Sequence, residues 1–186
     1  LEIVANLHSL LKVIGRKDLF MAGVTGKIAR KYMGHYIDAG SLCGGLSPEY
    51  ERLGKDLEEY NVELNPDTET SKNILGESTF KHNGYEVSSE VDPYYAETDS
   101  TLFEKLQKII DERLQDDNLK TNAVEVHLWK DATEGAYEAY KQECYVVPTS
   151  YGGDTSGYQI PFTVNYTGER IKGKYNISTG AFTPDA

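Results

Sequence analysis

The sequence predicts a mainly β (α+β) domain: an antiparallel β-sandwich or barrel-like fold with one flanking α-helix at about residues 100–116. Several segments alternate apolar and polar residues with the period of a half-buried strand, while only one segment has a helical apolar stripe. The 186 residues include 14 Tyr and 5 Phe, which are enriched in strands. This length corresponds to about one domain.

The first strand candidates precede the helix. Residues 32–37 are apolar and predict a strand, and the Gly- and Ser-rich segment 38–48 predicts a loop. Residues 50–65 alternate towards their end, which indicates a half-buried strand. In that strand Glu59 and Glu63 would share one face.

A turn signal follows in the next segment. Residues 71–75 and 78–87 are further strand candidates. Asn83-Gly84 is a strong hairpin dipeptide, so it predicts that the chain reverses within 78–87.

One segment is typical of an amphipathic helix. Thr101 and Glu104 match a capping box, and Asp99 is an alternative cap. A helix with a single stripe packs on another element, most economically a sheet. The stripe at i, i+3 and i+4 spacing consists of Leu102, Phe103, Leu106, Ile109, Ile110 and Leu114.

Strand patterns return after the helix. Residues 124–129, 137–147 and 158–166 alternate, and Pro161 predicts an edge position or bulge in the last of them. Thr167-Gly168-Glu169 predicts a hairpin loop.

Composition and motifs exclude several function classes. The net charge of −11 argues against a protein that holds nucleic acid by bulk charge, and no apolar run approaches the ~20 residues of a membrane span. Cys43 and Cys144 have no metal or redox spacing and predict reduced thiols. The four His are scattered, and no nucleophile or phosphate-loop motif occurs. We therefore expect no enzyme activity, no catalytic residue, no metal and no cofactor.

The N-terminal segment 1–20 differs from the rest of the chain. Its apolar residues have helical spacing, and its charge is slightly basic. Two interpretations stay open: an arm that docks on a partner, or an extension outside the native protein, with Met21 as the start. In either case residues 21–186 are expected to form a single domain.

Three ordered motifs carry a family resemblance. The first joins Val62-Glu63-Leu64-Asn65-Pro66-Asp67 to Lys72-Asn73-Ile74-Leu75-Gly76-Glu77-Ser78. The second joins Gly84-Tyr85-Glu86-Val87 to Val91-Asp92-Pro93-Tyr94-Tyr95-Ala96, and the third joins Tyr151-Gly152-Gly153-Asp154-Thr155 to Gly157-Tyr158-Gln159-Ile160-Pro161-Phe162. In this order, with the helix between the second and third, they resemble the major tail tube proteins of tailed phages and prophages of Gram-positive hosts.

The resemblance implies a structural virion protein. It implies a tail tube fold whose copies form hexameric rings that stack into a tube, through which DNA passes during ejection without specific binding. It further implies assembly in the bacterial host cytoplasm, contact with tape measure and tail completion proteins, and no membrane partner.

Candidate site residues follow from that implication. A carboxylate-rich wall would repel DNA, so Glu59 and Glu63 are candidates for facing the lumen, although both could instead face outer solvent. Candidate subunit or ring contacts are Pro93, Tyr94, Tyr95, Tyr151, Gly152, Gly153 and Asp154.

Two rival functions stay open. One is a monomeric β-sandwich binding or adaptor module of a phage or tail-like particle, which would form no rings. The other is a small hydrolase using scattered carboxylates, which would need a cleft with perturbed carboxylate pKa values.

Overall fold

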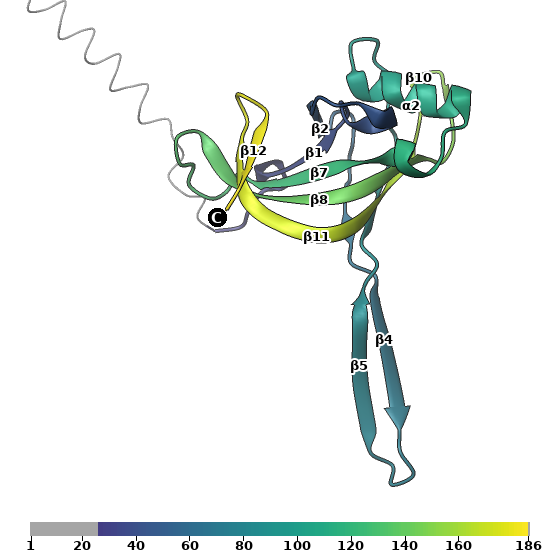
Figure 1. Cartoon of the computed structure of the whole chain (residues 1–186), viewed down its shortest axis with the longest axis vertical. Helices are drawn as coiled ribbons and strands as arrows, with labels where there is room; N and C mark the ends of the chain where they lie inside the picture. Colours follow the sequence, from purple (N-terminus) through teal and green to yellow (C-terminus); the bar gives the residue numbers. More distant parts are fainter. Residues whose placement is uncertain (1–25, 186) are drawn as a thin grey trace, which may run out of the picture.

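The computed structural model describes residues 26–185, and the expectations for residues 1–20 and Met21 lie outside this range. Within it, the prediction of a mainly antiparallel β fold with one α-helix is confirmed. The long strands of the main sheet curve strongly, and the helix covers one end of the curve (Figure 1).

The main sheet has eight antiparallel strands in the order β2-β1-β7-β8-β11-β6-β3, with β12 added beside β11. Two separate hairpins, β4–β5 and β9–β10, lie outside it. The strands of the main sheet are β1 (Met33–Asp38), β2 (Tyr50–Leu53), β3 (Val62–Glu63), β6 (Ser88–Val91), β7 (Lys120–His127), β8 (Ala136–Pro148), β11 (Phe162–Asn176) and β12 (Ala181–Pro184).

Apolar residues fill both sides of this sheet. Alternate residues of a strand point to opposite sides, so Ala123 belongs to one core and Val124 to the other. The first core lies under the helix and includes Ile37, Val146 and Phe162. Each large apolar side chain buried in this way contributes about 1.5–3 kcal/mol. The second core consists of Tyr36, Val124, Val126, Ala139 and Tyr175, with Phe182 of β12 packed against it.

The helix α2 (Thr101–Glu112) forms where the apolar stripe predicts it. Ser100, rather than Thr101 or Asp99, is its N-cap, because its side chain accepts a hydrogen bond from the Phe103 N–H. The helix ends at Glu112, earlier than the expected residue 116, because Arg113 adopts a left-handed conformation (φ 52°). Single 3₁₀ turns precede β1, follow β1 and follow the helix: η1 (Arg30–Tyr32), η2 (Leu42–Gly44) and η3 (Asp116–Leu119).

Two expected hairpin turns are β-bulges instead. Strand β5 (Ser78–Tyr85) runs through Asn83-Gly84, and its register with β4 (Pro66–Lys72) shifts at this point. Strand β11 likewise continues through the expected loop 167–169, with a register shift beside it. In both places a long partner strand satisfies the backbone on each side of the irregularity, so a bulge forms rather than a reversal.

The alternating run 158–166 is divided between two strands. Strand β10 (Gly157–Gln159) pairs with β9 (Gly152–Asp154), and β11 begins only at Phe162. Pro161 lies in the break, where its missing N–H costs no ladder hydrogen bond.

Candidate functional site

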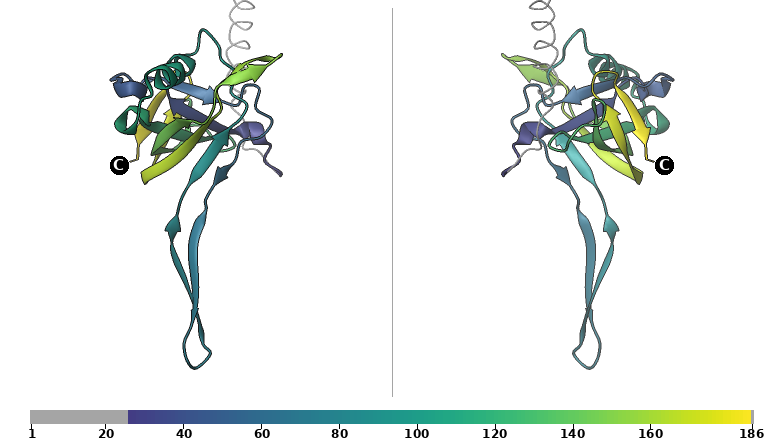
Figure 2. Two further views of the ribbon diagram at one scale, coloured as in Figure 1. Left: turned by 90° about the vertical axis from the view of Figure 1, so that its right-hand side faces the viewer. Right: turned by 90° about the vertical axis from the view of Figure 1, so that its left-hand side faces the viewer.

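A long two-stranded ribbon, formed by β4 and β5, projects far from the body of the molecule (Figures 1 and 2). Every residue of β4 is exposed, and so is every residue of β5 except the partly exposed Gly84. The ribbon pairs only with itself among residues 26–185. An isolated two-stranded hairpin is marginally stable in water, so this ribbon gains most from a partner surface.

Asn73 shapes the end of the ribbon. Its Oδ1 accepts hydrogen bonds of 3.0 Å from the N–H groups of Leu75 and Glu77, and its own N–H donates to the Glu77 carbonyl. Gly76 supplies the left-handed residue of the turn, with φ 82°. The turn therefore presents the side chains of residues 74 and 75 outward.

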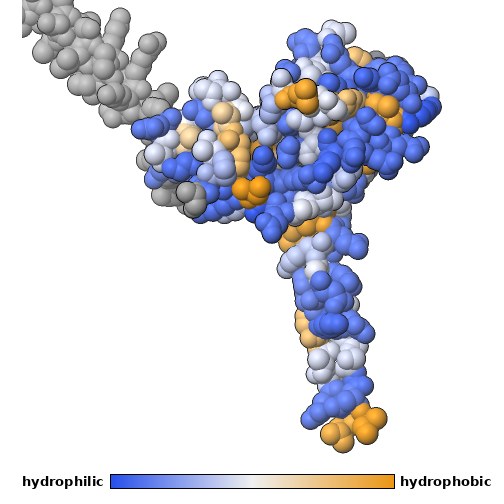
Figure 3. Space-filling model, viewed as in Figure 1, coloured by the Kyte–Doolittle hydropathy of each residue, from blue (hydrophilic) through white to orange (hydrophobic). Residues whose placement is uncertain are grey.

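The tip of the ribbon is hydrophobic. Ile74 and Leu75 have relative exposures of 104% and 78%, and Figure 3 shows a hydrophobic patch at the end of an otherwise mostly hydrophilic ribbon. We call Ile74, Leu75 and Glu77 the hairpin tip. A pair of aliphatic side chains held this far from the core makes the tip a candidate contact surface.

The ribbon also has an aromatic face. Phe80 pairs with Thr70 and lies on the face opposite to that of the Glu69–Lys81 pair. His82 and Tyr85, three residues apart, would normally point to opposite faces. The bulge at residue 83 restores them to one face, and their rings meet at 4.6 Å. One face is thus aromatic and the other charged.

The predicted lumen residues Glu59 and Glu63 lie close together, but not on one strand. Glu59 belongs to the loop before β3, and only Glu63 lies in the two-residue strand, so the expectation of a shared strand face is wrong. Both nevertheless line one surface hollow of about 310 Å³, together with Glu90 and Asp92. Sequence reasoning missed Glu90 and Asp92, because they enter the hollow through the pairing of β6 with β3.

The predicted contact residues Pro93, Tyr94 and Tyr95 are all partly buried. The Tyr94 ring packs edge-on against Phe162 at 5.4 Å, and its hydroxyl lies 2.9 Å from Ser100 Oγ. Burial raises the pKa of Tyr94 to about 12. Tyr94 is therefore part of the core beside the helix, while Tyr95 forms a bridge to Gln159 of β10.

The other predicted contacts, Tyr151, Gly152, Gly153 and Asp154, lie in or next to the exposed β9–β10 hairpin. The Asp154 carboxylate accepts a 2.7 Å hydrogen bond from the Ser156 N–H and so shapes the turn. A side chain at Gly153 would collide with the Gly157 carbonyl, which explains the glycine there. The structure brings this hairpin beside Tyr95, and not beside Glu63.

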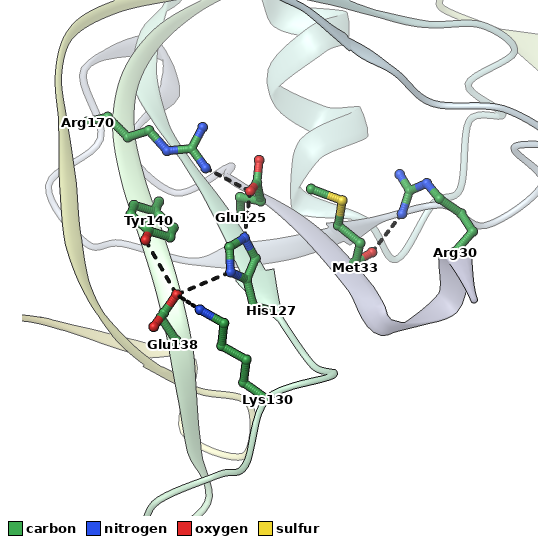
Figure 4. Close-up of polar contacts among 8 residues, drawn as sticks. All are labelled: Arg30, Met33, Glu125, His127, Lys130, Glu138, Tyr140 and Arg170. Atoms are coloured by element: carbon green, nitrogen blue, oxygen red, sulfur yellow. Dashed lines mark hydrogen bonds and ion pairs between the residues drawn. The ribbon is translucent and has the colours of Figure 1, made fainter. Parts of the chain in front are cut away.

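A network of charged residues, missed at the sequence level, lies on strands β7, β8 and β11 (Figure 4). His127 Nε2 lies 2.9 Å from Glu125 Oε1, and its Nδ1 lies 3.3 Å from Glu138 Oε1 without hydrogen-bond geometry. Lys130 pairs with Glu138, and its hydrogen bond is the main cause that lowers the pKa of Glu138 to about 2. These charges neutralise one another, so we interpret the network as structural.

Other classes of site find little support in the described part of the chain. Within residues 26–185, no group of three or more His, Cys, Asp or Glu is arranged to hold a metal ion. In the same range, no helix has the length and hydrophobicity needed to cross a membrane.

No protein-family model matches the chain, and no curated protein matches it either.

Proposed function

We propose that this chain is a structural subunit of a phage or prophage tail tube, which assembles with copies of itself into stacked hexameric rings that enclose a channel for DNA. The observation that carries the proposal is the β4–β5 ribbon, with its exposed tip and aromatic face. Among residues 26–185 the ribbon pairs with no strand of the main sheet, so that sheet gains no backbone pairing from it. A neighbouring subunit supplies the missing surface.

The geometry of such a contact favours an extended assembly. A ribbon that projects from one subunit onto a different surface of the next is a heterologous contact, which closes into rings or continues into stacks. The main sheet ends in the edge strands β2 and β3, and a subunit interface would cover such edges. Two resemblance motifs, Val62–Asp67 and Gly84–Val87, overlap the ends of β4 and β5 at the base of the ribbon, which supports the same interpretation.

The charge distribution suits a DNA channel. Glu59, Glu63, Glu90 and Asp92 line one hollow in a chain of net charge −11. If this hollow faces the channel, it repels phosphates and keeps the duplex from binding the wall. Tape measure and tail completion proteins are the further partners that the proposal includes.

Electron microscopy of the concentrated protein tests the proposal. We expect rings or tubes from the full chain and only monomers from a variant in which an Asn-Gly turn replaces residues 68–82. A single cooperative urea transition with the unfolding free energy of the full chain serves as the folding control for the variant.

Gene neighbourhood provides the second part of the test, because tube polymerisation can require an initiator. We expect genes for a tape measure and head–tail joining proteins beside this one. Monomers at every concentration, together with a neighbourhood that lacks such genes, would overturn the proposal and favour the monomeric binding module.

A further inference from the structure

A second surface hollow differs in charge from the acidic hollow at Glu59. We call it the basic groove: a hollow of about 410 Å³ between η1 and the loop that follows β2. Four of its lining residues are cationic against one carboxylate, Glu58, and its apolar lining includes Leu53 and Leu57. The cations are Arg30, Lys31, Arg52 and Lys55, and Lys55 is already ion-paired with Glu97.

The two arginines of the basic groove are held in place by backbone groups. Arg30 donates hydrogen bonds to the carbonyls of Met33 and Tyr60, at 2.7 Å and 3.1 Å. Arg52 donates to the Lys31 carbonyl at 3.3 Å. Among residues 26–185, no carboxylate oxygen lies within 4.0 Å of either guanidinium, so both positive charges stay available to a partner.

Neighbouring hollows carry the opposite charge. The hollow beside Tyr95 is lined by Asp56, Glu58 and Glu97, and the hollow at Glu59 is acidic as described above. Neither offers a cation to an incoming carboxylate. The basic groove combines cations with an apolar floor, and this combination fits a protruding segment that has both aliphatic and acidic side chains.

We propose that the basic groove receives the hairpin tip of a second copy of this chain. Ile74 and Leu75 would cover the apolar floor, and the Glu77 carboxylate would meet the guanidinium of Arg52 or Arg30. The turn geometry supports this pairing. Ile74 and Leu75 are exposed, and the Asn73 side-chain amide donates a hydrogen bond to the Glu77 carboxylate, which holds it next to them. The inference rests on the proposed self-assembly and adds to it the surface that the ribbon contacts.

Site-directed crosslinking tests the contact. In a Cys43→Ser background, a Leu75→Cys chain is mixed with a differently tagged Lys55→Cys chain, and a short bismaleimide is added to the assembled protein. We expect a crosslinked heterodimer from this mixture. Ser156→Cys, which places the thiol in the acidic hollow beside Tyr95, is the matched control and should give little product.

A charge exchange provides the second readout. Arg52→Glu should lower the yield of the Leu75→Cys to Lys55→Cys crosslink by about threefold, the effect of one exposed ion pair. Glu77→Arg in the partner should restore the yield. Rings or tubes that form without this crosslink, or that crosslink to Ser156→Cys instead, would overturn the groove assignment and leave the assembly proposal standing. A wild-type chain that fails to assemble and fails to crosslink would overturn both.

Discussion

Arg170 of β11 reaches across the intervening strand β8 to Glu125 of β7, with Nη2 of the arginine 2.7 Å from Oε1 of the carboxylate. The same guanidinium lies 4.5 Å from the centre of the Tyr140 ring. His127 contacts the same carboxylate oxygen from the other side. Burial has the largest influence on the pKa of Glu125 and raises it, but its hydrogen bond from His127 and the charge of Arg170 outweigh burial, so the pKa is lowered.

Replacing Arg170 should lower the unfolding free energy, because it removes a partner of the buried Glu125 carboxylate. The Glu125 side chain is only 14% exposed, so Arg170→Met leaves a largely desolvated charge with one partner fewer. We expect a loss of about 1–3 kcal/mol of unfolding free energy, measured by urea denaturation at pH 7. Lys172→Met is the control: it lies on the same strand, but its side chain is 54% exposed and its amine makes only a long 3.7 Å pair with Glu138, so its loss should cost less than about 0.5 kcal/mol. Equal losses in the two variants would contradict this reading of the network.

His35 should make stability depend on pH. It is 6% exposed beside the Tyr60 ring, and burial lowers its pKa from 6.5 to about 4. Between these values the unfolded chain binds more protons than the folded chain, so stability falls as the pH drops from 6.5 to about 4 and then levels off with respect to this group. The contribution is at most about 3 kcal/mol.

Chemical denaturation at pH 7 and pH 4.5 measures the His35 effect. We expect His35→Phe to reduce the loss of stability between these two pH values. His82→Gln, on the exposed ribbon, should leave the loss unchanged. An unaltered loss in the His35 variant would show that this histidine does not set the pH dependence.

Local sequence patterns predict those helices and strands that pack one side on the core, because burial imposes a period on their own residues. Strand β7 was predictable because its apolar residues recur with a period of two, as in a strand of a sheet. Helix α2 was predictable because the side packed on the core forms a single apolar stripe. The turn signal at Asn83-Gly84 failed because β4 offers a partner on both sides of it, which a local dipeptide cannot show. The loop expected at residues 167–169 failed in the same way beside the long strand β8.

The candidate contact surface was harder to predict than the fold. The ribbon is exposed on both faces, so β4 lacks the alternation that marks a half-buried strand. Ile74 and Leu75 are adjacent apolar residues, but two such residues are equally typical of the end of a strand and of an exposed contact tip. The acidic hollow depends on strands that are distant in sequence, so only Glu59 and Glu63 could be proposed from the sequence.

Ser100 should be the stabilising cap of α2. Its Oγ accepts a 3.0 Å hydrogen bond from the Phe103 N–H and lies 2.8 Å from the Glu51 carboxylate. Ser100→Ala should therefore cost about 1 kcal/mol of unfolding free energy in a urea titration. Asp99→Ala, one residue earlier and outside the cap position, should cost less than about 0.5 kcal/mol. A larger loss from Asp99→Ala than from Ser100→Ala would show that Asp99, the alternative cap expected from the sequence, caps the helix.

The last prediction concerns the acidic hollow at Glu59 and separates assembly from DNA passage. Glu59→Lys combined with Glu63→Lys places two cations where carboxylates line the hollow, without altering the ribbon or the basic groove. We expect tubes to form as before, and DNA ejection from particles built with the variant to be slower, because cations at a channel wall hold phosphates. Glu104→Lys with Glu112→Lys on helix α2 provides the same change of charge elsewhere and should leave ejection at its normal rate. Normal ejection with the Glu59 and Glu63 replacements would count against a place for these carboxylates at the channel wall.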